Sequence, residues 1–176
     1  PGHPFPHVRN KSLNLGVMLS REGETEPGFG VVQVPMMLPR LIEVQGSIRS
    51  DGGVPTKHAF VLLEDLIARH VGMIFPGVKL KGVYAFRVTR NFDLEIDEEE
   101  AQDLLQTIQQ ELRRRERGAA VRLEVAGEPT HDSLIKLIRA LKLDPDRDVY
   151  RAPFLNVSDL MGWVPREERR DLREDP

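Results

Sequence analysis

Two arginines, Arg87 and Arg90, stand near the end of a run of β-branched and aromatic residues that spans 78–90. The run predicts a strand, the longest in the chain, on which alternate side chains point to opposite faces. Arg87 therefore shares one face with Thr89, whereas Arg90 shares the other face with Phe86. A planar guanidinium can bind phosphate through paired N–H donors, but an internal carboxylate or a partner subunit would satisfy it as well. Both interpretations stay open, and the structural ion pair or subunit contact is the favoured one.

Lys11 is a third cationic residue that could contact phosphate. A phosphate-binding loop has a glycine immediately before its lysine, and here that residue is an asparagine. A Gly-Phe-Gly sequence that starts at residue 28 resembles the beginning of a dinucleotide fingerprint, but Gln33 stands where its third glycine is needed. The sequence therefore contains no nucleotide-binding loop. We take Lys11, Arg87 and Arg90 as candidates for a phosphate contact or a dimer contact.

No other set of residues forms a catalytic or metal-binding motif, so we predict no catalytic residue and no metal ligand. The five histidines lack the spacing of a zinc site, and the absence of cysteine excludes disulfides, thiolate metal sites and cysteine nucleophiles. The acidic residues from Asp97 to Glu100 are explained by the start of a helix. The basic stretch from Arg113 to Arg117 is best explained as the solvated end of that helix, with contact to a polyanion as the alternative.

Composition limits the class of protein. The 176 residues are 40% hydrophobic and 30% charged, which is ordinary for one globular domain. The net charge of −3 argues against a domain-wide basic surface for nucleic acid. No apolar run approaches the roughly 18 to 20 residues of a membrane-spanning helix. Because the chain starts without methionine and ends in a highly charged stretch, we interpret it as part of a longer protein, with 1–164 as one domain and 165–176 as a linker.

Alternating apolar residues predict most of the strands. Leu13 to Leu19 reads as a half-buried strand, and the next strand, over 29–34, should pair with it in antiparallel orientation. Ser50 to Gly53 is a strong turn signal. It should join a strand over 41–44 to another over 59–62.

Helical spacing predicts three helices. The first spans 63–74, the second spans 97–117 with acids at its start and arginines at its end, and the third follows a Thr130 cap and ends near Pro145. Residues 149–163 should be irregular with one short helical turn. We expect an α+β fold, with an antiparallel or mixed sheet and about three helices packed mainly on one face, in a single domain.

Short sequence blocks occur in a fixed order along the chain. The blocks are His3–Pro6 with Asn10–Leu15, Val32–Pro35 with Leu38–Arg40, Leu62–Ile67 with Phe75–Gly77, Phe86–Arg90 with Asp93, Leu94 and Asp97, Arg113–Arg115 with Val121–Val125, Asp148–Tyr150, and Asp159–Met161. Together they resemble the middle, or head, domain of the bacterial long-chain polyphosphate kinase family. One block would be weak evidence, whereas this many in order is strong.

The resemblance implies a parent enzyme that reversibly transfers the terminal phosphate of ATP to polyphosphate, with Mg²⁺ and through a phosphorylated histidine. That histidine would lie in C-terminal domains outside this chain, so the resemblance assigns the segment no catalytic residue and no bound cofactor of its own.

The resemblance also implies partners and a location. The segment would pack against its own N- and C-terminal domains, contribute to a homodimer and border the path of polyphosphate, with Arg87, Arg90 and Lys11 as the candidate contacts. Nucleic acid is not an expected partner. The implied location is cytoplasmic, with peripheral association at the inner membrane face as an option. The alternative function is that of a free-standing protein-interaction domain without kinase activity.

Overall fold

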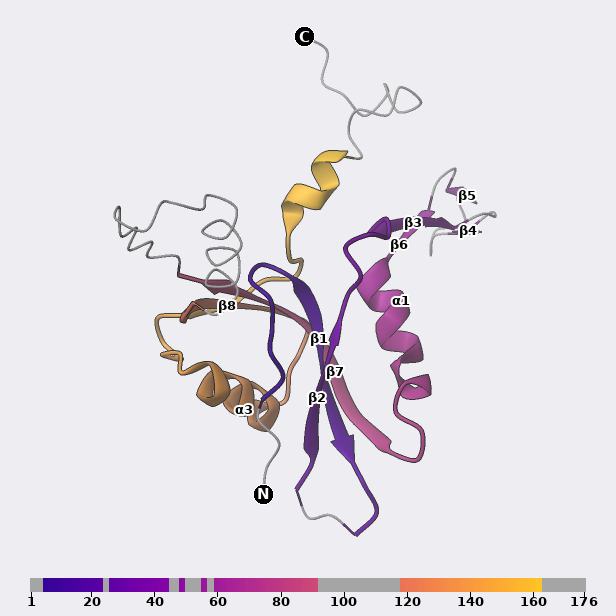
Figure 1. The fold of residues 1–176 in the computed structure, drawn as a ribbon. Coiled ribbons are helices and arrows are strands. Elements are labelled where there is room, and N and C mark those ends of the chain that lie inside the picture. Colours follow the sequence, from indigo (N-terminus) through magenta and orange to yellow (C-terminus); the bar gives the residue numbers. More distant parts are fainter. Residues whose placement is uncertain are drawn as a thin grey trace, which may run out of the picture.

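A mixed five-stranded sheet forms the centre of the molecule (Figure 1). The computed structural model describes residues 5–23, 26–44, 48–49, 55–56, 59–91 and 118–162. The sheet has the order β2-β1-β7-β8-β9, with the bounds Leu13–Ser20 for β1, Gly28–Gln33 for β2, Lys79–Arg90 for β7, Ala120–Ala126 for β8 and Val149–Arg151 for β9. Neighbouring strands are antiparallel except β8 and β9, which run parallel. The predicted mixed sheet is therefore confirmed, and β7 is its longest strand.

Two short antiparallel pairs extend from one end of the sheet. The pairs are β3 (Leu41–Val44) with β6 (Ala59–Leu62), and β4 (Ile48–Arg49) with β5 (Pro55–Thr56). The strands predicted over 41–44 and 59–62 are therefore confirmed as neighbours, whereas the turn predicted at 50–53 lies outside the described residues.

The two described α-helices lie on opposite faces of the sheet (Figure 1). Helix α1 (Leu63–His70) continues directly from β6 and ends in a 3₁₀ turn, η1 (Val71–Met73). Helix α3 (His131–Leu141) follows β8. The expectation of helices mainly on one face is thus wrong, because each of these helices buries its own apolar stripe against a different face. The helix predicted over 97–117 lies outside the described residues.

Strand β1 is buried on both faces, so the prediction of a half-buried strand is wrong. Leu13, Leu15 and Val17 pack into the cluster under α1, as their alternation suggested. Asn14 and Met18, on the other face, are buried as well. Gly16 lies between these two, and a Cβ at that position would come within 2.8 Å of the Tyr84 ring. The small residues of β1 that looked solvent-facing in the sequence therefore make room for the core under α3.

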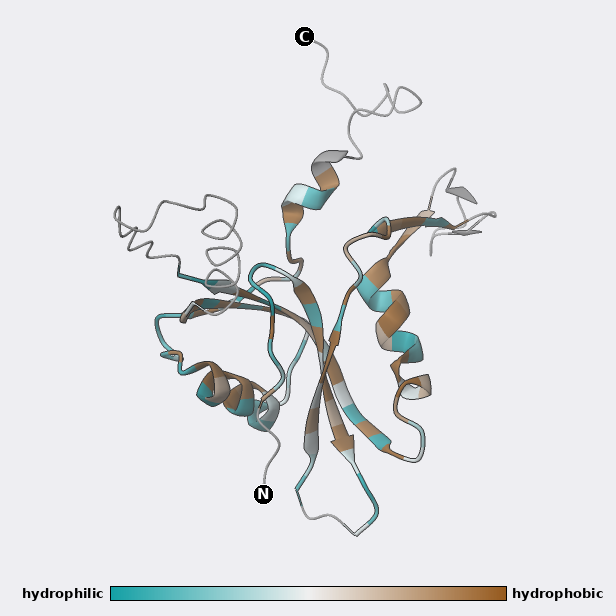
Figure 2. Ribbon diagram, viewed as in Figure 1, coloured by the Kyte–Doolittle hydropathy of each residue, from teal (hydrophilic) through white to brown (hydrophobic). Residues whose placement is uncertain are grey.

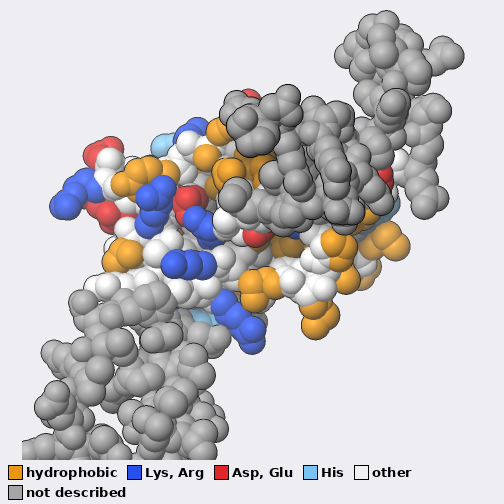
Figure 3. Space-filling view, turned by 90° about the horizontal axis from the view of Figure 1, so that it is seen from above, with side chains coloured by type: hydrophobic (Ala, Val, Ile, Leu, Met, Phe, Trp, Pro, Cys, Tyr) orange, Lys and Arg blue, Asp and Glu red, His pale blue; other side chains and the backbone are white. Residues whose placement is uncertain are grey.

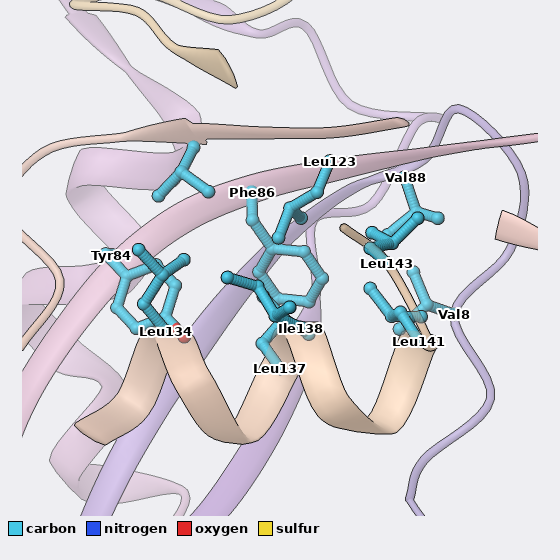
Figure 4. Close-up of a cluster of buried hydrophobic side chains, with 11 residues drawn as sticks. Val8, Tyr84, Phe86, Val88, Leu123, Leu134, Leu137, Ile138, Leu141 and Leu143 are labelled. Atoms are coloured by element: carbon cyan, nitrogen blue, oxygen red, sulfur yellow. The ribbon is translucent and has the colours of Figure 1, made fainter. Parts of the chain in front are cut away.

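Helix α3 follows its prediction closely. Thr130 caps it by accepting a hydrogen bond from the Ser133 backbone N–H, and Lys142 ends it in a left-handed conformation. Hydrophobic residues cover the face that it turns to the sheet (Figure 2). Figure 4 shows these side chains meeting those of β7 and β8 in one cluster, whose buried members are Val8, Tyr84, Phe86, Val88, Leu123, Val125, Leu134, Leu137, Ile138, Leu141 and Leu143.

Tyr84 places a phenol in this cluster. We therefore predict that the folded chain loses stability at alkaline pH. Burial raises the pKa of Tyr84 from 10.0 to about 12, and a hydrogen bond with the Ser133 side chain opposes part of this shift. The hydroxyl also donates a hydrogen bond to the Ser133 carbonyl oxygen at 3.3 Å. The unfolded chain releases this proton at a lower pH than the folded chain. Stability is therefore lost as the pH rises from 10 towards 12, by about 2–3 kcal/mol from this group.

Tyr84→Phe should cost about 1 kcal/mol at neutral pH, because one hydrogen bond is lost. It should also remove most of the decline above pH 10, as measured by denaturant unfolding at each pH. Tyr150→Phe is the matched control, since Tyr150 is half-exposed. An equal alkaline decline in the Tyr84→Phe variant and in the unmodified chain would contradict the prediction.

Candidate functional site

A cavity of about 620 Å³ lies beside the loop that leads into β3. The 3₁₀ helix η3 (Val157–Gly162) lies next to it, at the same end of the sheet. Its lining combines apolar side chains with charged and polar ones. The lining residues are Lys11, Leu13, Val34, Pro35, Met36, Leu38, Pro39, Arg40, Leu41, Ile42, Glu43, Phe60, Leu63, Asn156 and Asp159. Residues from both ends of the described chain thus meet around one opening.

Arg40 is the central charged residue of this cavity. Its Nε lies 3.0 Å from Glu64 Oε1 and 3.1 Å from Oε2, and its Nη2 makes a further short contact with Glu64. Its Nη1 donates to the Asn156 carbonyl oxygen at 2.9 Å and to Asp159 Oδ2 at 3.0 Å. The guanidinium also stacks on the Phe154 ring, 4.5 Å from its centroid. The side chains of Arg40 and Glu64 are only 10% and 6% exposed.

Local geometry explains how Arg40 meets Glu64. Arg40 directly precedes β3, and its carbonyl oxygen accepts the backbone N–H of Leu63, the first residue of α1. Glu64 therefore sits in the first turn of α1, beside the guanidinium. Burial alone would lower the pKa of Arg40, but the hydrogen bonds and charges of Glu64 and Asp159 outweigh it and raise the pKa above its ordinary value.

Asn156 connects Arg40 to a second arginine. Arg87 Nη1 donates to Asn156 Oδ1 at 2.6 Å, and Arg87 Nε donates to Glu124 Oε2 at 2.8 Å. Asn156 adopts a left-handed backbone conformation, and its amide donates to Asp159 Oδ1 at 2.7 Å. We call this network the arginine hub, and its members are Arg40, Glu64, Arg87, Glu124, Asn156 and Asp159.

The three cationic residues singled out from the sequence lie in different surroundings. Arg87 belongs to the hub through its ion pair with Glu124, at 2.7 Å. The exposed Lys11 lines the cavity, and its backbone N–H donates to the Val88 carbonyl oxygen. Arg90 lies away from both, donating to the carbonyl oxygens of Val8 at 3.1 Å and Gly118 at 2.9 Å. Burial lowers the pKa of Arg90. The fold thus brings Lys11 and Arg87 towards the cavity but not Arg90.

The charges of the cavity are largely neutralised by one another. Arg40 is paired with Glu64 and Asp159, and Arg87 is paired with Glu124, so neither arginine presents an unpaired fork to an incoming phosphate, and the two arginines and three carboxylates leave the hub with a net negative charge. Within the part of the chain that the structure describes, no group of three or more histidines or acidic residues could hold a metal ion. These residues do not fit Mg²⁺ or the phosphates of ATP. The arrangement instead links the ends of β3 and α1 to β7, β8 and η3 through one network of hydrogen bonds and ion pairs.

Sequence reasoning missed Arg40, Glu64 and Asn156 as members of one site. Arg40 is separated from Glu64 by 24 positions and from Asp159 by 119 positions. No periodicity links residues so far apart. The one available signal was that Arg40, Glu64 and Asp159 each lie inside a block that carries the family resemblance.

Comparison with known proteins gives a consistent result. A family model described as "Polyphosphate kinase middle domain" matches residues 1–163. The chain is 44% identical to the polyphosphate kinase of Bacillus anthracis over 151 residues, which cover 84% of this chain and 20% of that protein. It is 38% identical to the polyphosphate kinase of Aphanizomenon baltica over 167 residues, 93% of this chain and 43% of that protein. The chain thus spans less than half the length of these relatives.

A solved structure shares the fold. The crystal structure of polyphosphate kinase from Porphyromonas gingivalis matches with a TM-score of 0.64 at 23% identity, over 96% of this chain and 23% of that one. Among the described helices, none has the length and apolar character needed to cross a bilayer.

Proposed function

The chain belongs to the polyphosphate kinase family as its middle domain, and from this premise we propose that it is a non-catalytic module of an enzyme that reversibly transfers the terminal phosphate of ATP to polyphosphate. One observation supports the non-catalytic role most strongly. Both arginines of the arginine hub are paired with carboxylates, and no group of three or more histidines or acidic residues that could hold a metal ion occurs among the described residues.

In this proposal, the chemistry belongs to other parts of the longer protein. The phosphorylated histidine lies in its C-terminal domains, and a helical N-terminal domain helps to hold the nucleotide base. The enzyme uses ATP and Mg²⁺ and works in the cytoplasm or at the inner face of the membrane. The module described here contributes contacts in a dimer and borders the polyphosphate path. The lengths of the relatives support a multi-domain parent, since the chain covers 20% of the Bacillus anthracis protein.

The experiment that tests this proposal compares the 176-residue chain with the full-length enzyme. Both are incubated with ATP and Mg²⁺, and polyphosphate formation is measured under the same conditions. The full-length enzyme should turn over, and the chain alone should give no signal above a buffer blank. Turnover by the purified chain would overturn the non-catalytic role.

Of the candidate contacts, Lys11 is the best placed to meet polyphosphate. It is exposed, lines the cavity and has no ion pair with any described residue, whereas Arg87 is paired with Glu124 and Arg90 donates to backbone carbonyls. Lys11→Ala in the full-length enzyme should weaken polyphosphate binding and flatten its dependence on salt, because one contact that releases counterions is lost. The matched control is Lys81→Ala, which removes an exposed lysine of β7 away from the cavity.

Polyphosphate binding and its dependence on salt are measured in the same way for Arg87→Ala and Arg90→Ala, together with dimerisation. If either variant keeps its polyphosphate affinity but no longer dimerises, that arginine is a structural or subunit contact. If Lys11→Ala and Lys81→Ala show the same affinity and the same salt slope, Lys11 is not a polyphosphate contact.

A further inference from the structure

We infer that the mouth of the cavity is a docking groove for another domain of the same full-length polypeptide. This inference rests on the proposed function, because it requires that the module works inside a longer enzyme. Its central feature is a stretch of three successive apolar residues, which we call the methionine rim: Met36, Met37 and Leu38.

The methionine rim is unusually exposed for apolar side chains. Met36, Met37 and Leu38 are 72%, 91% and 50% exposed. Hydrophobic residues continue from this loop along β3 and onto α1 (Figure 2). Figure 3 shows hydrophobic side chains projecting on the α1 side of this end of the molecule, while Lys and Arg gather towards the other side. A contiguous apolar surface with a polar border is typical of an interaction site.

The backbone of the methionine rim is constrained at both ends, which favours docking. Pro35 and Pro39 bracket the methionine rim and fix the backbone φ angle at both of its ends. The buried side chains of Leu13, Val34 and Leu63 line the cavity behind it. The prolines reduce the backbone entropy that is lost when an occupant binds, and the flexible methionine side chains can adapt to its shape.

The charged residues at the opening indicate which side chains an occupant should carry. Arg40 is only 10% exposed, whereas Asp159, its partner in the arginine hub, is 37% exposed, so the hub presents a carboxylate to the solvent. The groove therefore fits an aliphatic side chain next to a lysine or arginine that approaches Asp159. Lys11, also exposed, offers the opposite charge to a polar border of the occupant.

The length of the relatives favours the same polypeptide over a second copy. The chain covers 20% of the Bacillus anthracis protein and 23% of the Porphyromonas gingivalis structure, so most of a parent enzyme lies outside it. Domains tethered in one polypeptide meet at effective concentrations that reach the millimolar range. A tethered domain therefore covers an apolar groove before a free partner does.

Thiol labelling of the full-length enzyme tests the inference. Met36→Cys places a thiol at the rim, and Met73→Cys is the matched control, because Met73 is 82% exposed and does not line the cavity. Each thiol is labelled with a maleimide and followed by mass spectrometry of its own peptide, first in the native enzyme and then in denaturant. We expect the native Met36→Cys thiol to react at least tenfold more slowly than the native Met73→Cys thiol, with equal rates in denaturant.

A photo-crosslinker attached to the Met36→Cys thiol identifies the occupant. A product of monomer mass, crosslinked to a peptide outside residues 1–176, is the expected result. A product of twice that mass would assign the groove to the partner subunit and overturn the inference. Equal native labelling rates would overturn it as well. Neither readout depends on turnover, so an active enzyme with an open groove would refute the docking without refuting the proposed function.

Discussion

Replacing Arg40 with methionine will lower the free energy of unfolding of the chain by about 3–5 kcal/mol, the loss expected when one member of a buried ion pair is removed. The substitution keeps an unbranched apolar stem of similar reach but leaves Glu64, which is 6% exposed, as an uncompensated buried carboxylate. It also takes away the donors to the Asn156 carbonyl oxygen and to Asp159. Equilibrium denaturation of the purified chain measures the loss.

Two further variants make this prediction specific. Arg139→Met changes the same residue types at an exposed position of α3 and should stay within about 0.5 kcal/mol of the unmodified chain. The double variant Arg40→Met with Glu64→Leu removes both charges and should recover a large part of the loss, because no buried carboxylate is left unpaired. If Arg40→Met costs no more than Arg139→Met, the hub does not hold β3, α1 and η3 together.

Phe86→Ala should destabilise the chain by about 3–5 kcal/mol, through lost burial and the cavity left behind. The Phe86 side chain is fully buried and lies between the sheet and α3, where it meets the residues of the helix (Figure 4). Its ring also packs against that of Tyr84, at 6.2 Å between centroids.

The controls for this variant are Phe86→Leu and Met73→Ala. Phe86→Leu keeps most of the apolar volume and should cost clearly less than the alanine variant. Met73→Ala truncates a side chain that is 82% exposed and should have almost no effect. A loss below about 1 kcal/mol for Phe86→Ala would mean that the cluster under α3 is not the main core.

Local patterns accounted for the elements whose contacts are local. The cap at Thr130 and the stripe of Leu134, Leu137 and Ile138 specified helix α3, because both depend on residues within a few positions. Its end was placed near Pro145, whereas the helix stops at Leu141, where the left-handed Lys142 already closes the last turn.

Long-range features were not predictable from local patterns. Alternation in β1 indicated one buried face, and only the placement of α1 and α3 on opposite sides of the sheet buries the other face. Strand β9 was missed because its three residues acquire their strand geometry by pairing in parallel with β8. The arginine hub was missed for the same reason, since Arg40 and Asp159 meet only after the whole chain has folded.

The ion pair of Arg87 was predictable in part from local patterns and in part not. The sequence indicated that an arginine on a mostly apolar strand needs an acceptor, which is a local argument. Which acceptor it finds depends on the register of β7 with β8, where Arg87 lies opposite Glu124. The sequence therefore predicted that Arg87 needs an acceptor, and the pairing of β7 with β8 identifies this acceptor as Glu124.

The central claim is that the arginines of the hub are paired with carboxylates and that the described residues form no nucleotide site. Thermal unfolding of the 176-residue chain with and without saturating ATP and Mg²⁺ tests it most directly, because a ligand at 100 times its Kd stabilises the folded state by about 2.7 kcal/mol. We predict an unchanged Tm. A rise of about 5 °C or more, the shift that such stabilisation gives a chain of this size, would contradict the claim.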